Sequence, residues 1–150
     1  MVALLDDLQQ DLKLVDGREL QTIFIGGGTP SLFSGNAIAK LLDGVARRSN
    51  FAHNIEITME ANPGSSELEK FSAFRAAGVN RLSIGVQSFS PKHLSSLGRV
   101  HSSNEALSAA NAAQQAGYER INLDSMYALP GQTPANARED IAQAIELDPE

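Results

Sequence analysis

The chain has 150 residues, a formal net charge of −6 at pH 7 and no cysteine. Its length suffices for one domain with a hydrophobic core, and 42% hydrophobic with 20% charged residues are typical of a globular protein rather than a disordered one. The negative charge and the scattered basic side chains disfavour nucleic-acid binding, and no apolar run is long enough to span a membrane. The amino terminus lacks the pattern of a signal peptide, so we expect a cytoplasmic protein without disulfides.

Helix and strand patterns alternate in the first half of the chain. Apolar residues at helical spacing predict a helix over residues 4–15, and the β-rich run at 20–25 predicts a strand. Ser34 is placed to cap a second helix over residues 35–45. Alternating apolar residues at 54–60 predict a second strand.

The alternation continues in the second half of the chain. Ser66 and Glu69 have the spacing of a capping box, and Pro91 and Pro134 suit the first position of a helix. The predicted elements are a helix from Ser66 to Gly78, a strand at 80–87, a helix opened by Ser90 and Pro91, an alanine-rich helix within 102–117, a strand within 119–130, and a helix from Thr133 to Ile145.

This order of elements predicts an α/β fold, because strands that alternate with helices form a parallel sheet with crossover connections. An open doubly wound sheet and part of a (β/α) barrel both satisfy the pattern. Since the chain starts and ends on helical segments, we expect a partial (β/α) barrel of four parallel strands. Residues 1–150 would then be the central part of a barrel domain, truncated at both ends.

Glycines or polar residues stand where the predicted strands end. Three glycines and Thr29 follow the first strand, Glu60 ends the second, Gln87 ends the third, and Asp124 lies in the fourth. Each residue alone has a structural explanation, such as a solvated acid or a hydrogen bond within a loop. All four together favour a binding site, because parallel α/β folds bind ligands beyond the carboxyl ends of their strands.

The glycine run matches neither of two common phosphate-binding motifs. The sequence has no G-x-x-x-x-G-K-[ST] loop and no G-x-G-x-x-G fingerprint followed by an acidic residue. No lysine ends a strand, the histidines lack metal-ligand spacing, and no G-x-S-x-G elbow is present. A tight turn remains one explanation of Gly26–Gly28, and a close approach of bare backbone to a ligand is the other.

Five motifs occur in an order that resembles the radical S-adenosylmethionine superfamily. They are "GGGTPS", "MEANPG", "GVNRLSIGVQSF", "LGRVHS" and "NLDSMYALPGQ", and together they cover nearly the whole chain. The branch that they resemble contains oxygen-independent coproporphyrinogen III oxidase and a related haem chaperone. Ser125 and Ala128 depart from the residues that are frequent in this branch and leave the motif recognisable.

The resemblance implies a set of residues that bind S-adenosylmethionine. Arg99 corresponds to an arginine that can reach the methionine carboxylate, since a guanidinium fork suits that group. The carboxylates of Glu60 and Asp124 suit an ammonium group and ribose hydroxyls. The cofactor-binding set is Gly27, Gly28, Thr29, Glu60, Gln87, Arg99 and Asp124.

One element of the family is missing from this sequence. The family binds a four-iron, four-sulfur cluster through a C-x-x-x-C-x-x-C loop, and this chain has no cysteine. We expect the cluster ligands to lie before Met1, so that this chain alone is inactive and contains neither catalytic nor metal-ligating residues. The full-length protein would bind a tetrapyrrole, either a porphyrinogen or haem.

The residues by themselves are also compatible with two other functions. One is a phosphate-binding barrel enzyme that acts on a sugar phosphate, and the other is a non-enzymatic binding module that has lost its cluster. Because a truncated parallel sheet has two unpaired edges, we also expect this chain to self-associate.

Overall fold

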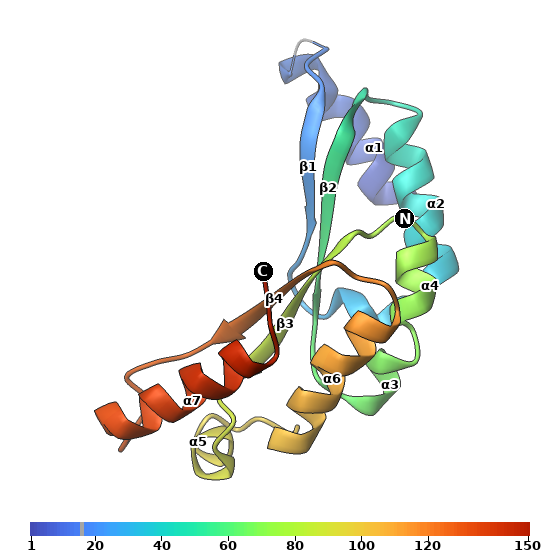
Figure 1. Ribbon diagram of the computed structural model, residues 1–150. Coiled ribbons are helices and arrows are strands. Elements are labelled where there is room, and N and C mark those ends of the chain that lie inside the picture. The colour runs from blue at the N-terminus through green and yellow to red at the C-terminus, as the bar shows by residue number, and fades with distance from the viewer. Residues whose placement is uncertain (16) are drawn as a thin grey trace.

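The structure is a computed structural model that describes residues 1–15 and 17–150, without the side chains of residues 65 and 66. Strands and helices alternate along the chain (Figure 1). The strands are β1 (Leu20–Ile25), β2 (Phe51–Ala61), β3 (Arg81–Gln87) and β4 (Arg120–Ser125). The helices are α1 (Val2–Asp11), α2 (Gly35–Ala46), α3 (Ser65–Leu68), α4 (Phe71–Ala76), α5 (Pro91–Ser96), α6 (Ser103–Gln115) and α7 (Pro134–Glu146), with short 3-10 helices at Leu12–Leu14 and Pro30–Leu32.

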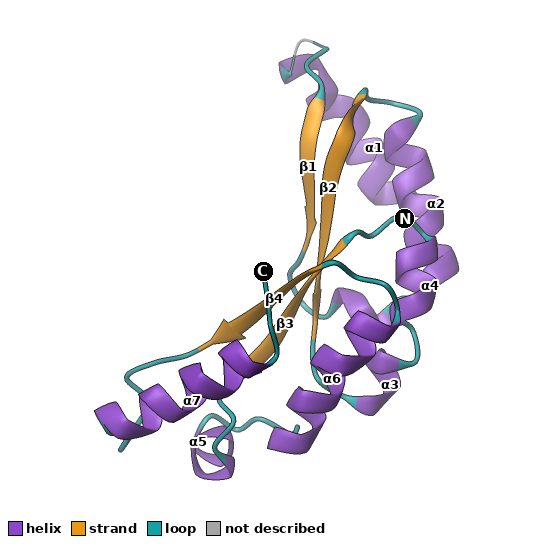
Figure 2. Ribbon diagram, viewed as in Figure 1, coloured by secondary structure: helices purple, strands orange, loops and turns teal. Residues whose placement is uncertain are grey.

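The described strands form one sheet in the order β1-β2-β3-β4, and every neighbouring pair is parallel. Figure 2 shows the strands bending away from the helices, which all lie on the outer side of the curved sheet. A doubly wound sheet would carry helices on both faces. The predicted α/β class and partial (β/α) barrel are therefore confirmed.

The hydrophobic core lies between the sheet and this single helical layer. Alternate strand residues such as Met59, Leu82 and Ile84 are fully buried there, and they pack in one cluster with Phe71 and Phe74 of α4. Burial of one side chain of this size contributes about 1.5–3 kcal/mol. Because successive side chains of a strand point to opposite faces, the residues between these buried ones point away from the helices.

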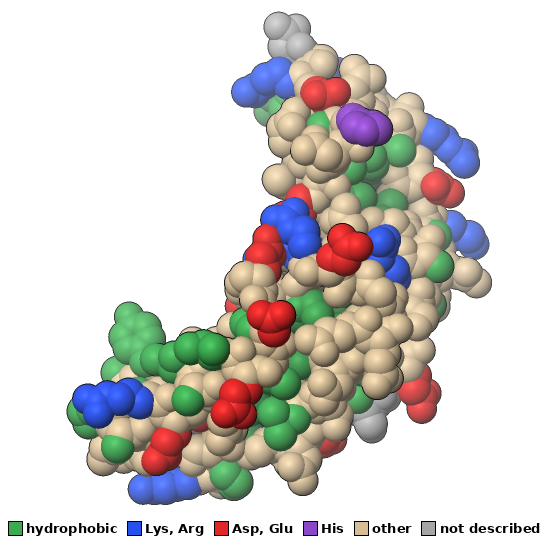
Figure 3. All heavy atoms as spheres, in the orientation of Figure 1, with side chains coloured by type: hydrophobic (Ala, Val, Ile, Leu, Met, Phe, Trp, Pro, Cys, Tyr) green, Lys and Arg blue, Asp and Glu red, His purple; other side chains and the backbone are tan. Residues whose placement is uncertain are grey.

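The opposite face of the sheet is concave and mostly polar. Arg81 and Arg120 lie side by side in the register of β3 and β4, and Arg81 is 2.7 Å from Glu150 while Arg120 is 2.7 Å from Glu56. Acidic and basic side chains gather on this inner side of the bend (Figure 3). Because these ion pairs are partly exposed, solvent screens them and each contributes little to stability. They occupy the half of the concave face that lies toward the amino ends of the strands.

Most predicted helix starts are observed, and one predicted helix is divided. Ser34 accepts a hydrogen bond from the N–H of Ala37 at 3.2 Å, and Pro91 and Pro134 stand at helix starts. The helix predicted from Ser66 to Gly78 is two short helices, α3 and α4. The capping box predicted at Ser66 falls on a side chain outside the described part of the structure. Among the described residues, no helix is long and apolar enough to cross a bilayer.

Candidate functional site

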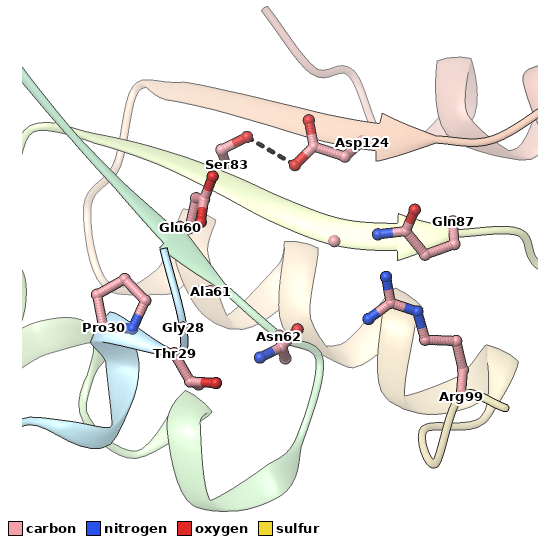
Figure 4. Close-up of a pocket in the computed structure, with 11 residues that line it drawn as sticks. Gly28, Thr29, Pro30, Glu60, Ala61, Asn62, Ser83, Gln87, Arg99 and Asp124 are labelled. Atoms are coloured by element: carbon pink, nitrogen blue, oxygen red, sulfur yellow. Dashed lines mark hydrogen bonds between the residues drawn. The ribbon is translucent and has the colours of Figure 1, made fainter. Parts of the chain in front are cut away.

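A cavity of about 250 Å³ opens at the carboxyl ends of the four strands (Figure 4). It brings together six of the seven residues that the sequence predicted, and Gly27 lies beside it in the first loop. The lining residues are Gly28, Thr29, Pro30, Glu60, Ala61, Asn62, Ser83, Gly85, Gln87, Arg99 and Asp124. We refer to this cavity as the rim pocket.

The glycine run after β1 lets the chain turn against Glu60. Gly27 and Gly28 have φ angles of 83° and 61°, in the left-handed region that favours glycine. The N–H of Gly27 donates to Oε2 of Glu60 at 3.1 Å. A Cβ atom on Gly26 would lie 3.0 Å from Oε1 of Glu60, whereas Cβ atoms on Gly27 and Gly28 would meet nothing within 4 Å. The loop is therefore packed on one side and open on the other.

A buried carboxylate ties this first loop to the end of β2. Oε2 of Glu67 accepts hydrogen bonds from the hydroxyl of Ser31 and from the N–H of Asn62, the latter at 2.8 Å. Both Glu67 and Ser31 are buried. Lys70 donates to the carbonyl of Ser31 at 3.1 Å. Glu67 does not stand out in the sequence, because a glutamate early in a helix looks like an ordinary capping residue.

Asp124 is held by two neighbours that point the same way from the sheet. The hydroxyl of Ser83 donates to Oδ2 of Asp124 at 2.8 Å, drawn as a dashed line in Figure 4. Nδ2 of Asn122 donates to Oδ1 of Asp124 at 2.7 Å and to the Ser83 hydroxyl at 2.9 Å. Strand periodicity could have identified Asn122, which lies two positions before Asp124 on the same face of β4. Ser83 is the register partner of both Asn122 and Glu60. Both carboxylate oxygens of Asp124 are thereby fixed in place.

Gln87 and Arg99 lie at the other end of the rim pocket. Figure 4 shows their head groups side by side, with Arg99 reaching in from the loop after α5. The backbone of Gln87 has a φ of 66°, and a Cβ atom on Gly85 would lie 2.9 Å from its Nε2. Gly85 therefore leaves room for the amide of Gln87 above the strand.

The rim pocket combines one cation with two anions. Glu60 and Asp124 present carboxylates, Arg99 presents a guanidinium, and Gln87 adds an amide. Such a set can bind a ligand that carries an ammonium group, a carboxylate and hydroxyl groups. It does not fit an iron–sulfur cluster, because the sequence supplies no cysteine. Within residues 1–15 and 17–150, no three His, Asp or Glu side chains are grouped to hold a metal ion.

Comparison with known proteins gives one consistent group of relatives. Residues 3–144 match the model of the Radical SAM superfamily. The heme chaperone HemW of Escherichia coli (strain K12) is 54% identical over 146 residues, which are 97% of this chain and 39% of that protein. The solved structure of coproporphyrinogen III oxidase (HemN) from Escherichia coli, described as a radical SAM enzyme, has a TM-score of 0.80 at 31% identity and covers 97% of this chain and 34% of its own.

A more distant structure shares the fold alone. Elp3 of the archaeon Methanocaldococcus infernus has a TM-score of 0.67 at 18% identity, over 93% of this chain and 36% of its own. The chain thus spans 39% of the length of the curated relative HemW.

Proposed function

The chain belongs to the radical SAM superfamily, and from this we propose that the rim pocket binds S-adenosylmethionine. The observation that carries the proposal is the convergence of Glu60, Gln87, Arg99 and Asp124 on one cavity, although they are far apart in the sequence. The pocket's charges fit the zwitterionic methionine end of that molecule. Its position at the carboxyl edge of a parallel sheet is the usual place for a ligand in such folds.

Each residue has a proposed contact. Arg99 binds the methionine carboxylate through its planar guanidinium, and Glu60 binds the ammonium group. Asp124 accepts hydrogen bonds from the ribose hydroxyls, and Gln87 contacts the polar groups beside them. The first loop, with Gly27, Gly28 and Thr29, lies along the methionine backbone, where its open side leaves space for close approach.

The cluster of this family is proposed to lie outside this sequence. When bound beside a reduced cluster, S-adenosylmethionine supplies a radical through cleavage of its sulfonium bond. With no cysteine in this chain and 39% of HemW covered, we place the three cluster ligands in another part of the protein. Residues 1–150 are then the central part of a barrel domain and are inactive alone. Three cysteines encoded upstream of Met1 in C-x-x-x-C-x-x-C spacing would support this assignment.

We further propose that the whole protein acts on or carries a tetrapyrrole. Relatives named heme chaperone and coproporphyrinogen III oxidase support this class of partner. The identity of 54% to HemW against 31% to HemN favours the haem chaperone over the oxidase.

Two further expectations stay predictions. They are a location in the cytoplasm and self-association of this chain through the unpaired edges of its sheet.

The two other functions have less support. A phosphate group would lie against the carboxylates of Glu60 and Asp124, and this repulsion disfavours a sugar-phosphate enzyme. A non-enzymatic module that has lost its cluster would have the same residues in the rim pocket. The gene sequence upstream of Met1 distinguishes the two cases, because only a protein that retains the cluster encodes the three cysteines there.

Titration with S-adenosylmethionine tests the proposed function. In the full-length protein with its cluster reconstituted, Arg99→Ala removes a charge-assisted hydrogen bond worth roughly 1.5–3 kcal/mol, so the dissociation constant should rise about ten- to over a hundredfold. The visible absorbance of the cluster should persist, because Arg99 is not one of its ligands. Arg138→Ala, on the exposed surface of α7, is the matched control and should bind as the wild type does. Equal dissociation constants for Arg99→Ala and the wild type would contradict the proposal.

A further inference from the structure

Gln87 is held in a strained turn at the end of β3. Its φ is 66°, in a region that non-glycine residues rarely adopt. The N–H of Ser88 donates to the carbonyl of Val86 at 2.8 Å, which closes a three-residue turn centred on Gln87. A turn of this kind with positive φ is rare and strained. Such a conformation persists only where the surrounding contacts hold it, and it is frequent at functional sites.

Two of the contacts around this turn come from α7. Asp140 lies on that helix, is 5% exposed and does not line the rim pocket. Its Oδ2 accepts from the hydroxyl of Ser88 at 2.7 Å, and its Oδ1 accepts from the N–H of Phe89 at 2.8 Å. Ser88 is fully buried, and its hydroxyl also accepts from the N–H of Ser90 at 3.0 Å. Both oxygens of a buried carboxylate are thus satisfied by the two residues that follow Gln87.

Two further contacts fix the other side of the turn. The N–H of Met126 donates to the carbonyl of Gln87 at 2.8 Å. The ring Nε2 of the buried His101 lies 3.0 Å from the carbonyl of Val86. These contacts join the turn to the residue that follows β4 and to the segment before α6. Asp140 differs from them because it is charged, and hydrogen bonds to a charged acceptor are about twice as strong as neutral ones.

We propose that Asp140 is a positioning residue for the rim pocket. It holds Ser88 and Phe89, and through them it keeps the strained backbone of Gln87 in the conformation that directs its amide into the pocket. This inference rests on the proposed function, because it takes S-adenosylmethionine as the ligand that Gln87 contacts. Without the carboxylate, the backbone at Gln87 relaxes and the amide leaves the position above Gly85.

A double-mutant cycle measures this effect on binding in the full-length protein. Gln87→Ala removes the amide, and we expect S-adenosylmethionine to bind about three- to tenfold more weakly, as for loss of one neutral hydrogen bond. Asp140→Asn keeps the size of the side chain and removes its charge, and it should weaken binding by no more than Gln87→Ala does. The double variant should bind as Gln87→Ala alone. Losses that multiply in the double variant, or unchanged binding by Asp140→Asn, would overturn the inference.

A control separates this effect from a general loss of stability. Tyr118 is buried, and its hydroxyl donates to the carbonyl of Phe71 at 3.2 Å, away from the rim pocket. Tyr118→Phe removes that hydrogen bond and should lower the melting temperature while leaving the dissociation constant unchanged. If Tyr118→Phe weakens binding as Asp140→Asn does, Asp140 has only a structural role.

Hydrogen exchange of the ligand-free protein gives a readout that does not depend on S-adenosylmethionine. The amides of Ser88 and Met126 should exchange faster in Asp140→Asn than in Tyr118→Phe, since only the former loosens the turn. Equal exchange in the two variants would overturn the inference even if the proposed function holds. If Asp140→Asn does not fold, Ser88→Ala tests the same contact and leaves the bond from Phe89 to Asp140 intact. A wild type that fails to bind S-adenosylmethionine, or Gln87→Ala that binds equally well, would instead contradict the proposed function.

Discussion

The backbone N–H of Gly27 lies 3.1 Å from a carboxylate oxygen of Glu60, and this contact joins the loop after β1 to the end of β2. It depends on the absence of a side chain at the preceding position. A Cβ atom on Gly26 would lie 2.7 Å from the ring of Phe24 and 3.0 Å from the carboxylate of Glu60. The glycine run therefore has two separate roles, which are close packing at Gly26 and positive φ at Gly27 and Gly28.

Gly26→Ala should impair ligand binding more than stability. The ring of Phe24 is 61% exposed and can rotate away, and the flexible carboxylate of Glu60 can shift, so we expect only a small change in melting temperature. The displaced carboxylate of Glu60 would lose its proposed hydrogen bond to the ammonium group of S-adenosylmethionine. The ligand should then bind at least about threefold more weakly, as for loss of one hydrogen bond. Calorimetric titration and thermal melting measure the two effects. A large fall in melting temperature with unchanged affinity would contradict this assignment.

Gly27→Ala should lower the stability of the fold. Its new Cβ atom meets nothing within 4 Å, but a φ of 83° is unfavourable for alanine. We expect the free energy of unfolding to fall by about 1–2 kcal/mol, the cost of placing an L-residue in a left-handed conformation. Urea denaturation measures this value. A variant as stable as the wild type would show that the loop relaxes without cost.

Glu67→Ala should destabilise the protein through two donors that lose their acceptor. The hydroxyl of the buried Ser31 and the N–H of the half-buried Asn62 both donate to the buried Glu67. A buried donor without a partner costs about 1–3 kcal/mol, and we therefore expect the free energy of unfolding to fall by at least about 1 kcal/mol. Glu69→Ala is the matched control, because Glu69 is two residues away and exposed. Equal effects of the two substitutions would contradict a role for Glu67 as a link between the loops.

Tyr118 should make the protein less stable in strong base. Burial raises the pKa of its phenol above the ordinary value of 10.0, and the nearby Arg75 opposes this only in part. The unfolded chain therefore loses the phenol proton at a lower pH than the folded protein does. Its contribution is fully present below pH 10 and is lost as the pH rises through the folded pKa. Urea denaturation at pH 8 and pH 11 should show a larger loss of stability for the wild type than for Tyr118→Phe, and parallel losses would refute this prediction.

The sequence predicted the elements well, because each depends on local spacing. The strands at 20–25 and 80–87 were found from short β-rich runs, and Glu60 and Gln87 were placed correctly because the carboxyl ends of parallel strands share one edge. Glu67 and Asp140 were missed for a physical reason. Their contacts join residues 36 and 52 positions apart, and no local pattern encodes such pairs. The division of α3 from α4 was also not predicted, since their apolar residues keep helical spacing across the break.

The one-sided covering of the sheet has a thermodynamic consequence for this chain. Its accessible surface is 8794 Å², whereas a folded monomer of 16.0 kDa exposes about 7,400 Å². Much of the concave face is already hydrated, so unfolding exposes less new surface than usual. The heat capacity change of unfolding should therefore fall below the roughly 1.8–2.3 kcal/mol/K typical of this length, and the denaturant m-value should be correspondingly low. Its stability would then vary only weakly with temperature, along a flattened curve.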